Sequence, residues 1–432
     1  MSVFAPSRAR RSSAGSAVPW STRPGGRHGP GFWLIAFAFL TAMAFSTVPT
    51  PLYPLYQARD GFSVFMVTIV FAGYAVGVLT SLLLAGRVSD QLGRKNVLFA
   101  ALALELVAAA MFIVEPPLPA LIAARVISGL GIGLVTATAT AYLQELHSIH
   151  RPGAAPQRFE IVSTAANIGG LGVGPLVSGI LAQYLGMPLR LPYVVFGTLL
   201  VIAIAAIALT PETVGARSVR PLPRPQRISI DRGDPVGYIS ACVAGFAAFA
   251  VFGLFTSVAP GFISGTLHQP SRALAGLVVF SVFGAAALAQ TLVGRLPARL
   301  RGIVGPVAQA VGVVVLAISM HTADLGAFVA AGIVVGAGAG VVFKSSVGAV
   351  AAMASPGRRS EALAGLFLFS YLGLAIPAIG IGIAALYTTE TNVMTWFAGI
   401  LLVLLAGIGA LTTRHGRSAG APDESRPPRT TA

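Results

Sequence analysis

Twelve long apolar runs constrain the fold of this chain more than any other feature of its sequence. Each run holds about 20 mostly apolar residues, enough to cross a hydrocarbon core about 30 Å thick as an α-helix. The alternating pattern of a membrane β-barrel is absent, and a helix is the other structure that can span a bilayer. The runs lie near residues 32–55, 62–85, 96–115, 119–144, 158–187, 192–210, 236–262, 272–294, 303–320, 325–352, 360–386 and 392–413.

The composition agrees with a chain whose solvent is the lipid bilayer. Hydrophobic residues make up 55% of the 432 residues, charged residues only 10%, and the mean hydropathy is +0.81. A soluble protein of this length would need far more charge to cover its surface. The single cysteine, Cys242, excludes an internal disulfide, and the six scattered histidines show no metal-ligand spacing. We therefore predict an all-α integral membrane protein with no metal and no cofactor.

A polar break divides the runs into two sets of six. Residues 211–235 are rich in Pro and Arg and are predicted to form a cytoplasmic linker. Gly86-Arg87 after the second run has a counterpart in Gly294-Arg295 after the eighth, which indicates a weak internal repeat. We expect two pseudo-symmetric six-helix bundles. The predicted segments are a disordered tail at 1–30, bundles at 31–210 and 236–413, the linker at 211–235 and a second tail at 414–432.

The positive charges are sorted between alternate loops. The net charge is +15, and 24 Lys and Arg residues lie on one side of the spans, against only Arg59, Arg190 and Arg272 on the other. Because basic loops stay in the cytoplasm, both termini are predicted to be cytoplasmic. Charge sorted by side indicates topology rather than a surface for nucleic acid. We expect a multi-pass protein of a bacterial-type inner (cell) membrane, whose first run is an uncleaved helix rather than a signal peptide.

Three segments carry a family resemblance. The loop between the second and third runs reads Gly86-Arg87-Val88-Ser89-Asp90-Gln91-Leu92-Gly93-Arg94-Lys95, with one carboxylate and three cations. It resembles the major facilitator superfamily signature G-x-x-x-D-[RK]-x-G-[RK]-[RK]. Residues 125–133 are similar to that family's fourth-helix motif, R-x-x-x-G-x-G-x-G, and residues 167–179 to its exporter-associated motif ending G-x-x-x-G-P-x-x-G-G. The resemblance covers roughly residues 31–413 and implies a twelve-helix transporter that works by alternating access.

Asp90 is, by this resemblance, the acidic centre of the charged loop, with Arg94 as its basic partner. The helix that begins near Ser360-Glu361 has free N–H groups with partial positive charge on the same side. A carboxylate docked there would hold the bundles together inside while the transporter opens outward, and Arg94 is expected to reach Glu145. The alternative is that the basic residues only anchor the loop. The predicted gating residues here are Gly86, Asp90, Gly93, Arg94, Lys95 and Glu145.

Two charged residues lie inside spans, where an unpaired charge is costly. Arg125 opens the fourth-helix motif, and Glu105 lies in the middle of the third run and is a possible partner for it. Glu105 is either a proton-binding carboxylate, a permanent partner for a basic group, or an outward-facing polar residue. The candidates for proton coupling are Glu105, Arg125 and Asp90.

The fifth run is predicted to form a tight, sliding seam between the bundles. A Gly-Pro step bends a helix, and small residues let a neighbour approach closely. The alternative is ordinary close packing, which membrane helices use everywhere. The predicted seam residues are Gly170, Gly174, Pro175 and Gly179.

A substrate cavity is expected between the first, fourth, seventh and tenth spans. An aromatic, weakly polar lining suits amphipathic organic compounds. Phe37, Thr41 and Phe45 share one helix face by their i, i+4 spacing. Lys344 either extends to the headgroups, lies in the cavity or pairs with Glu361. The cavity candidates are Phe37, Thr41, Phe45, Tyr53, Thr136, Thr140, Tyr142, Asn167, Phe246, Phe249, Phe252, Gln290 and Lys344.

The sequence thus predicts a secondary transporter that exports small amphipathic organic compounds in exchange for protons. Two alternatives remain: an uptake symporter or facilitator for a sugar or small metabolite, and a non-transporting membrane sensor. No nucleotide-binding loop or catalytic constellation is present, so we predict no enzyme activity. The expected partners are a small-molecule substrate, protons and the lipid bilayer, with no nucleic acid, and the expected state is a monomer.

Overall fold

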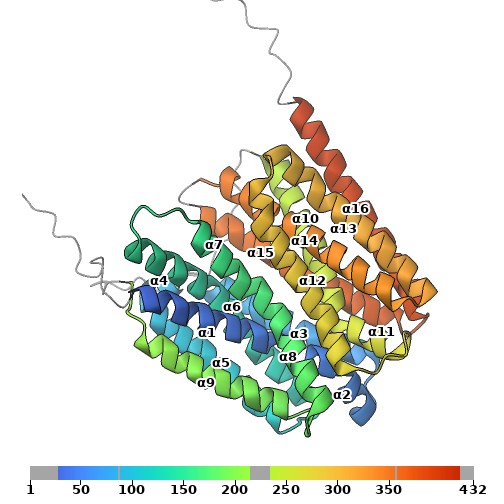
Figure 1. Cartoon of the computed structure of the whole chain (residues 1–432). Helices are drawn as coiled ribbons and strands as arrows, with labels where there is room; N and C mark the ends of the chain where they lie inside the picture. The colour runs from blue at the N-terminus through green and yellow to red at the C-terminus, as the bar shows by residue number, and fades with distance from the viewer. Residues whose placement is uncertain (1–27, 86–87, 215–233, 356–357, 419–432) are drawn as a thin grey trace, which may run out of the picture.

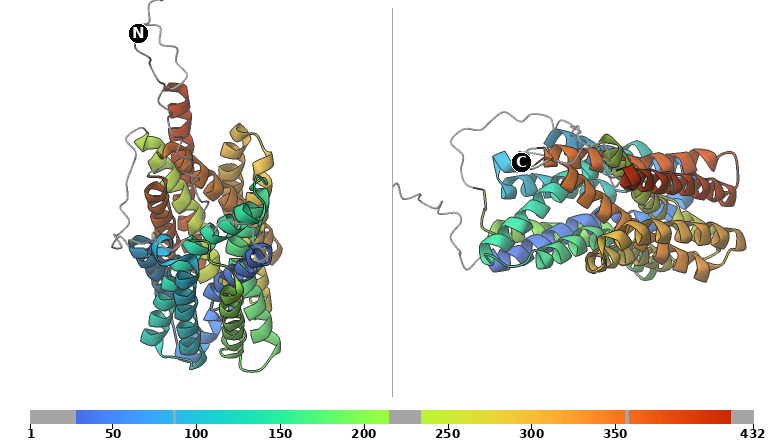
Figure 2. Two further views of the ribbon diagram at one scale, coloured as in Figure 1. Left: turned by 90° about the vertical axis from the view of Figure 1, so that its left-hand side faces the viewer. Right: turned by 90° about the horizontal axis from the view of Figure 1, so that it is seen from above.

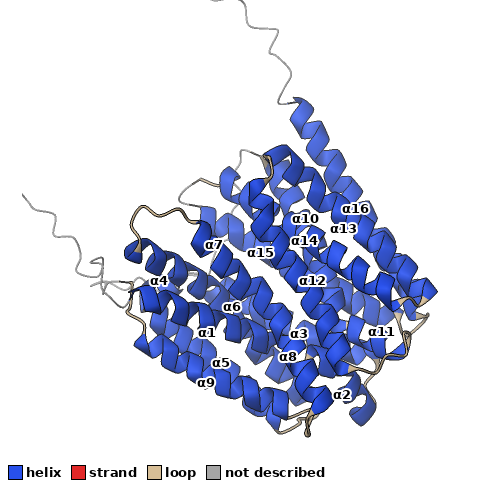
Figure 3. Ribbon diagram, viewed as in Figure 1, coloured by secondary structure: helices blue, strands red, loops and turns tan. Residues whose placement is uncertain are grey.

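The computed structural model describes residues 28–85, 88–214, 234–355 and 358–418, and every regular element in these ranges is a helix (Figure 3). Twelve helical segments within them are long and apolar enough to cross a membrane. The predicted all-α membrane fold is therefore confirmed. Most of both predicted tails and of the linker lies outside the described residues, as do Gly86 and Arg87.

The first six spans run from residue 28 to residue 209. The first span continues to Asp60, beyond the predicted limit of 55, because a short 3₁₀ turn at the prolines after Thr47 carries the helix on. The elements are α1 (His28–Thr47), η2 (Thr50–Leu52), α2 (Tyr53–Asp60), α3 (Val64–Ala85), α4 (Val88–Leu92), α5 (Arg94–Ile113), α6 (Leu118–His150), α7 (Gln157–Thr164), the π-helical η3 (Ala165–Gly169), α8 (Gly170–Tyr184) and α9 (Leu191–Leu209).

The last six spans run from residue 235 to residue 411, and three of their helices begin at side-chain N-caps. The side chains of Asp234, Ser271 and Asp324 accept hydrogen bonds from backbone N–H groups of the first turn, as N-cap residues do. The elements are α10 (Pro235–Ser257), α11 (Ala259–Gly265), α12 (Arg272–Leu292), η4 (Val293–Arg295), α13 (Ala298–Thr322), α14 (Leu325–Met353), α15 (Arg359–Ala384) and α16 (Glu390–Ser418).

The helices form two halves that lie side by side. The blue-to-green helices α1–α9 make up the N-terminal half, and the yellow-to-red helices α10–α16 make up the C-terminal half (Figures 1 and 2). Across the interface, α8 packs along α12 and α3 packs along α15. We call the end that carries α4, α7 and the start of α1 the predicted cytoplasmic end. The end that carries α2 and α11 is the predicted outer end.

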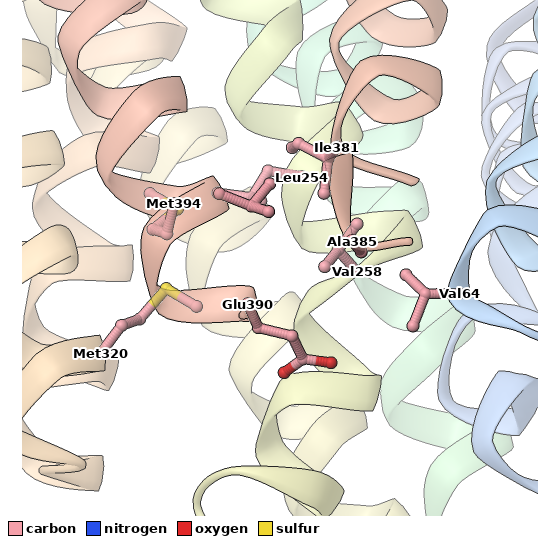
Figure 4. Close-up of a pocket in the computed structure, with 9 residues that line it drawn as sticks. Val64, Leu254, Val258, Met320, Ile381, Ala385, Glu390 and Met394 are labelled. Carbon is pink, nitrogen blue, oxygen red and sulfur yellow. The ribbon is translucent and has the colours of Figure 1, made fainter. Parts of the chain in front are cut away.

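The two halves meet closely at the predicted outer end. A Cβ atom on Gly179 of α8 would overlap the carbonyl oxygen of Arg272 at the start of α12. A Cβ atom on Gly382 of α15 would overlap the Thr68 side chain of α3. Nearby, Val64 of α3 faces Ala385 and neighbouring apolar side chains of the C-terminal half (Figure 4). Glycines thus allow the halves to touch through their backbones at this end.

Candidate functional site

A cavity lies between the two halves near the middle of the helices. Both halves contribute to its wall, in which eight of the eighteen lining residues are aromatic. Its lining residues are Met43, Ser46, Thr47, Phe71, Tyr74, Arg125, Thr136, Asn167, Ile168, Leu171, Phe249, Phe252, Thr256, Phe283, Phe343, Phe367, Tyr371 and Leu374.

The wall differs in part from the predicted one. Among the predicted candidates, Thr136, Asn167, Phe249 and Phe252 line the cavity. The face predicted for the first span is wrong, because Phe45 packs against Phe112 of α5 inside the N-terminal half. On α1 the cavity is lined instead by Met43, Ser46 and Thr47. Spacing along a helix groups residues into faces, but it does not say which face meets the cavity.

The remaining cavity candidates lie elsewhere. Thr41, Tyr53 and Tyr142 are buried in the packed interior of the N-terminal half, and Phe246 lines an apolar groove beside α16. Three others, Phe37, Thr140 and Gln290, are also outside the cavity wall. Their predicted place in the cavity lining is therefore wrong. Each of them is at least partly buried by neighbouring helices.

Lys344 contacts both halves toward the predicted cytoplasmic end, outside the cavity lining. Its Nζ donates a hydrogen bond to the backbone oxygen of Gln290, at 2.7 Å. It also lies 3.8 Å from Oε2 of Glu160, on α7 of the other half. The lysine therefore forms an ion pair across the interface, a partner that the sequence did not suggest.

Arg125 is the cationic residue of the cavity wall, and it is 2% exposed. Its Nη1 donates a 2.6 Å hydrogen bond to the backbone oxygen of Ser46, whereas its Nε has no hydrogen-bond partner. The guanidinium carbon lies 4.7 Å from the ring centre of Tyr74 and 5.9 Å from that of Phe71. Aromatic faces at such distances stabilise a cation that is removed from water.

Glu105 lies on α5, behind α6, and is fully buried. Its Oε2 accepts a 2.9 Å hydrogen bond from the Ser128 hydroxyl, and its Oε1 has no partner. The predicted ion pair with Arg125 is not formed. Gly131 of α6 leaves room for the carboxyl group, because a Cβ atom there would lie only 2.6 Å from Oε1. Among the described residues, no cation therefore lies within salt-bridge distance of this carboxyl group.

The C-terminal half has an uncharged counterpart of this site. Glu105 is 11 residues beyond the first residue of α5, and Gln309 is 11 residues beyond the first residue of α13. Gln309 is also fully buried, and Gly338 of α14 packs against its backbone, whereas Gly131 packs against the carboxyl group of Glu105. Its Nε2 donates a 2.8 Å hydrogen bond to the backbone oxygen of Ala247. Sequence analysis missed Gln309, because an amide in an apolar run gives no signal of charge.

The predicted seam in the fifth span has two faces. Gly170 and Gly174 pack against the backbone of α1, so they join helices of the same half. This corrects their assignment to the seam between halves. Pro175 and Gly179 do face the other half: Gly276 of α12 packs on the Pro175 backbone, and Gly179 packs on the start of α12.

A network of charged and polar groups ties together the predicted cytoplasmic ends of the N-terminal helices. Nη2 of Arg94 lies 2.7 Å from Oε1 of Glu145, so the predicted contact is present. Nη1 of Arg94 donates to the Ser89 hydroxyl at 2.6 Å, and Nζ of Lys95 donates to the backbone oxygen of Ala208 at 2.9 Å. Asp90 lies in α4, and its side chain is outside the described part of the structure.

Glu212, just after α9, is a member of this network that sequence analysis missed. Its carboxylate accepts hydrogen bonds from the backbone N–H groups of Arg94 and Lys95, at 3.1 and 3.0 Å. It thereby caps α5, whose start follows Gly93 with a φ of 91°. No cluster of side chains suited to hold a metal ion occurs among the described residues.

Comparisons with known proteins match this architecture. The family model for the Major Facilitator Superfamily matches residues 35–236. An uncharacterized MFS-type transporter of Mycobacterium tuberculosis is 30% identical over 179 residues, 41% of this chain and 29% of that protein. A D-xylose-proton symporter-like protein of Arabidopsis thaliana is 34% identical over 110 residues, 26% of this chain and 22% of that protein. The chain thus matches less than a third of the length of either curated relative.

The fold as a whole is similar to that of a solved transporter. The crystal structure of the nucleoside transporter NupG aligns with a TM-score of 0.65 at 14% sequence identity. The alignment covers 88% of this chain and 99% of the other. At this identity the likeness concerns the fold alone.

Proposed function

We propose that the chain is a secondary transporter of the major facilitator superfamily, whose family model matches residues 35–236, and that it exports small amphipathic organic compounds in exchange for protons. The cavity between the halves supports transport, because a site enclosed by two bodies can be exposed alternately to either side when the bodies rock. In this structure the halves touch at the predicted outer end through Gly179 and Gly382. Separation at that end would open the cavity outward.

The single observation that carries proton exchange is the environment of Glu105. A carboxylate buried without a cation is costly, so this position suits a group that gains and loses a proton. The equivalent position along the helix in the C-terminal half holds the neutral, fully buried Gln309, which supports an uncharged side chain at this depth.

Ser128 connects Glu105 with the cavity wall. It donates to the Glu105 carboxyl group and lies three residues after Arg125, on the same side of α6. A change in the charge of Glu105 would therefore act close to Arg125, which lines the cavity. Proton binding and substrate binding would be coupled through this short stretch of α6.

The direction of transport is proposed from the fifth span. Its Gly-Pro segment resembles the exporter-associated motif, and Pro175 and Gly179 lie where α8 meets the other half. One comparison favours uptake instead, since the Arabidopsis relative is named as a D-xylose-proton symporter-like protein. The two functions share the cavity and the proton, and they differ in whether cells lose or gain the compound.

Retention of fluorescent amphipathic compounds in efflux-deficient bacteria tests the proposal. Cells with the wild-type protein should retain several-fold less of at least one compound than cells with an empty vector. A protonophore should abolish this difference, and so should Glu105→Gln at equal expression. Greater accumulation by wild-type cells would favour uptake, and unchanged accumulation of every compound would contradict export.

The charged loop is proposed to control closure at the predicted cytoplasmic end. Arg94, Glu145 and Glu212 bind α5, α6 and the end of α9 together, so these ends would move as one body. We propose that Asp90 docks against the start of α15 when the cytoplasmic end closes. Asp90→Asn should then lower efflux several-fold in the same retention assay while leaving the protein level in the membrane unchanged. Full efflux by the variant would contradict this role.

The charge distribution of the loops supports a proposed orientation in the membrane. We propose that the protein lies in the cell membrane as a monomer, with both termini in the cytoplasm. A reporter protein that is active only in the cytoplasm can be fused to either terminus. In the proposed orientation, both fusions should be active.

A further inference from the structure

The charge of the cavity wall discriminates between classes of substrate. Of the described residues that line the cavity, Arg125 is the one with a charged side chain, and neither Asp nor Glu is among them. Glu105 lies behind α6 and outside the lining. A cationic compound would therefore find no counter-ion in the wall, whereas an anionic one would find a guanidinium group.

The guanidinium group has hydrogen-bonding capacity left on the edge with which arginine binds carboxylates. Nη1 is occupied by the backbone oxygen of Ser46, but the buried Nε has no hydrogen-bond partner. A buried N–H without a partner is costly, and a ligand oxygen would remove that cost. Carboxylates bind arginine by accepting hydrogen bonds from Nε and a neighbouring amino group at the same time.

The rest of the wall suits a flat apolar body. Phe249 lies with its ring centre 4.8 Å from that of Phe343 and 5.4 Å from that of Tyr371. Phe252 stacks on Phe283 at 4.9 Å. Aromatic side chains in such offset and edge-on arrangements accept a further ring well. These side chains belong to the C-terminal half, whereas Arg125 belongs to the N-terminal half.

We infer that the cavity binds an aromatic carboxylate, with the carboxylate on the Nε edge of Arg125 and the ring among the phenylalanines of the C-terminal half. The inference rests on the proposed function, since it names the substrate class of the same cavity. Such a ligand contacts both halves, so its binding would be sensitive to their relative position. The inside-negative membrane potential also favours outward movement of an anion.

Binding to the purified wild-type protein in lipid nanodiscs tests the inference without any transport. The probes are 2-naphthoate, 2-naphthamide and 2-naphthylmethylammonium, which share one ring system and differ in charge. Titration calorimetry near neutral pH should show 2-naphthoate binding at least about tenfold more tightly than the other two. Equal affinities, or a preference for the ammonium compound, would overturn the inference.

Two variants assign the preference to Arg125. Arg125→Gln should remove the preference for 2-naphthoate over 2-naphthamide, and Arg125→Lys should keep part of it because the charge remains without the planar fork. Melting curves in the absence of ligand identify variants that do not fold. If both variants fail to fold, the probe series on the wild type still decides the question.

The result of the binding experiment does not depend on whether the protein exchanges its substrate for protons. Preferential binding of 2-naphthoate without proton-dependent efflux would refute the proposed function and leave the inference intact. Efflux of the ammonium compound, together with no preference for the carboxylate, would refute the inference and leave proton-driven export intact.

Discussion

Two buried residues at equivalent positions along their helices, one acidic and one neutral, carry the coupling proposal. Glu105 and Gln309 are both fully buried in the third membrane span of their halves. Each side chain has one oxygen, Oε1, without a hydrogen-bond partner. The other oxygen of Glu105 accepts from Ser128 on α6, whereas Nε2 of Gln309 donates to the α10 backbone. Glu105 could be predicted as a candidate for proton coupling from the sequence, because a charged residue is unusual in an apolar run. The sequence could not exclude pairing with Arg125, since spacing fixes depth in the membrane and not rotation about the helix axis.

Gln309→Glu should destabilise the protein by about 1–3 kcal/mol, because the buried donor to the Ala247 oxygen is lost and two acceptors then face each other. Chemical denaturation in detergent measures the change. Glu105→Gln is the matched control, because it introduces the residue that the other half already accommodates and should change the stability far less. Equal losses from both substitutions would contradict the proposed equivalence.

Glu212→Ala should weaken the start of α5 by about 0.5–2 kcal/mol, the usual cost of losing an N-terminal cap. Hydrogen exchange of the backbone amides at Arg94 and Lys95 should become faster. Glu160→Ala removes a carboxylate from the same end without touching this helix start, and it should leave that exchange unchanged. Unaltered exchange in the Glu212 variant would show that the carboxylate does not hold α5.

Glycines determine which helices can meet through their backbones. Motif resemblance located the fifth span as a seam, and Pro175 with Gly179 does face the other half. Gly170 and Gly174 instead pack on α1 within the same half. A run of small residues predicts close packing but not the partner, because glycines on neighbouring faces of one helix point to different neighbours. Gly382 was not predicted, although it makes the corresponding contact on α15.

Gly179→Ala should prevent full closure at the predicted outer end, because its Cβ atom would overlap the Arg272 backbone. Closure is measured by maleimide labelling of Gln57→Cys on α2 in a Cys242→Ser background. The labelling rate should rise several-fold. Gly380→Ala is the control, since no atom lies within 4 Å of a Cβ at that position. The same rate in both variants would contradict an outer contact through Gly179.

At the scale of the whole molecule, most of the architecture could be predicted from the sequence. A bilayer forces each spanning segment to bury its backbone in a helix of nearly fixed length, so apolar runs give the number and limits of the spans. The division into two halves followed from the polar break near residue 211. The cavity wall could be predicted only in part, because every face of such helices is apolar and hydropathy does not separate lipid from interior.

The central claim is that the protein exports a compound in exchange for protons by alternating access. Transport by the protein reconstituted in liposomes tests this claim most directly. The compound with the strongest efflux in the cell assay is followed in two modes: exchange between equal concentrations on both sides, and accumulation driven by an imposed pH gradient. The wild type should perform both. Glu105→Gln should retain exchange, since its cavity is intact, and lose accumulation driven by the gradient. Gradient-driven accumulation at the wild-type rate in this variant would contradict the account.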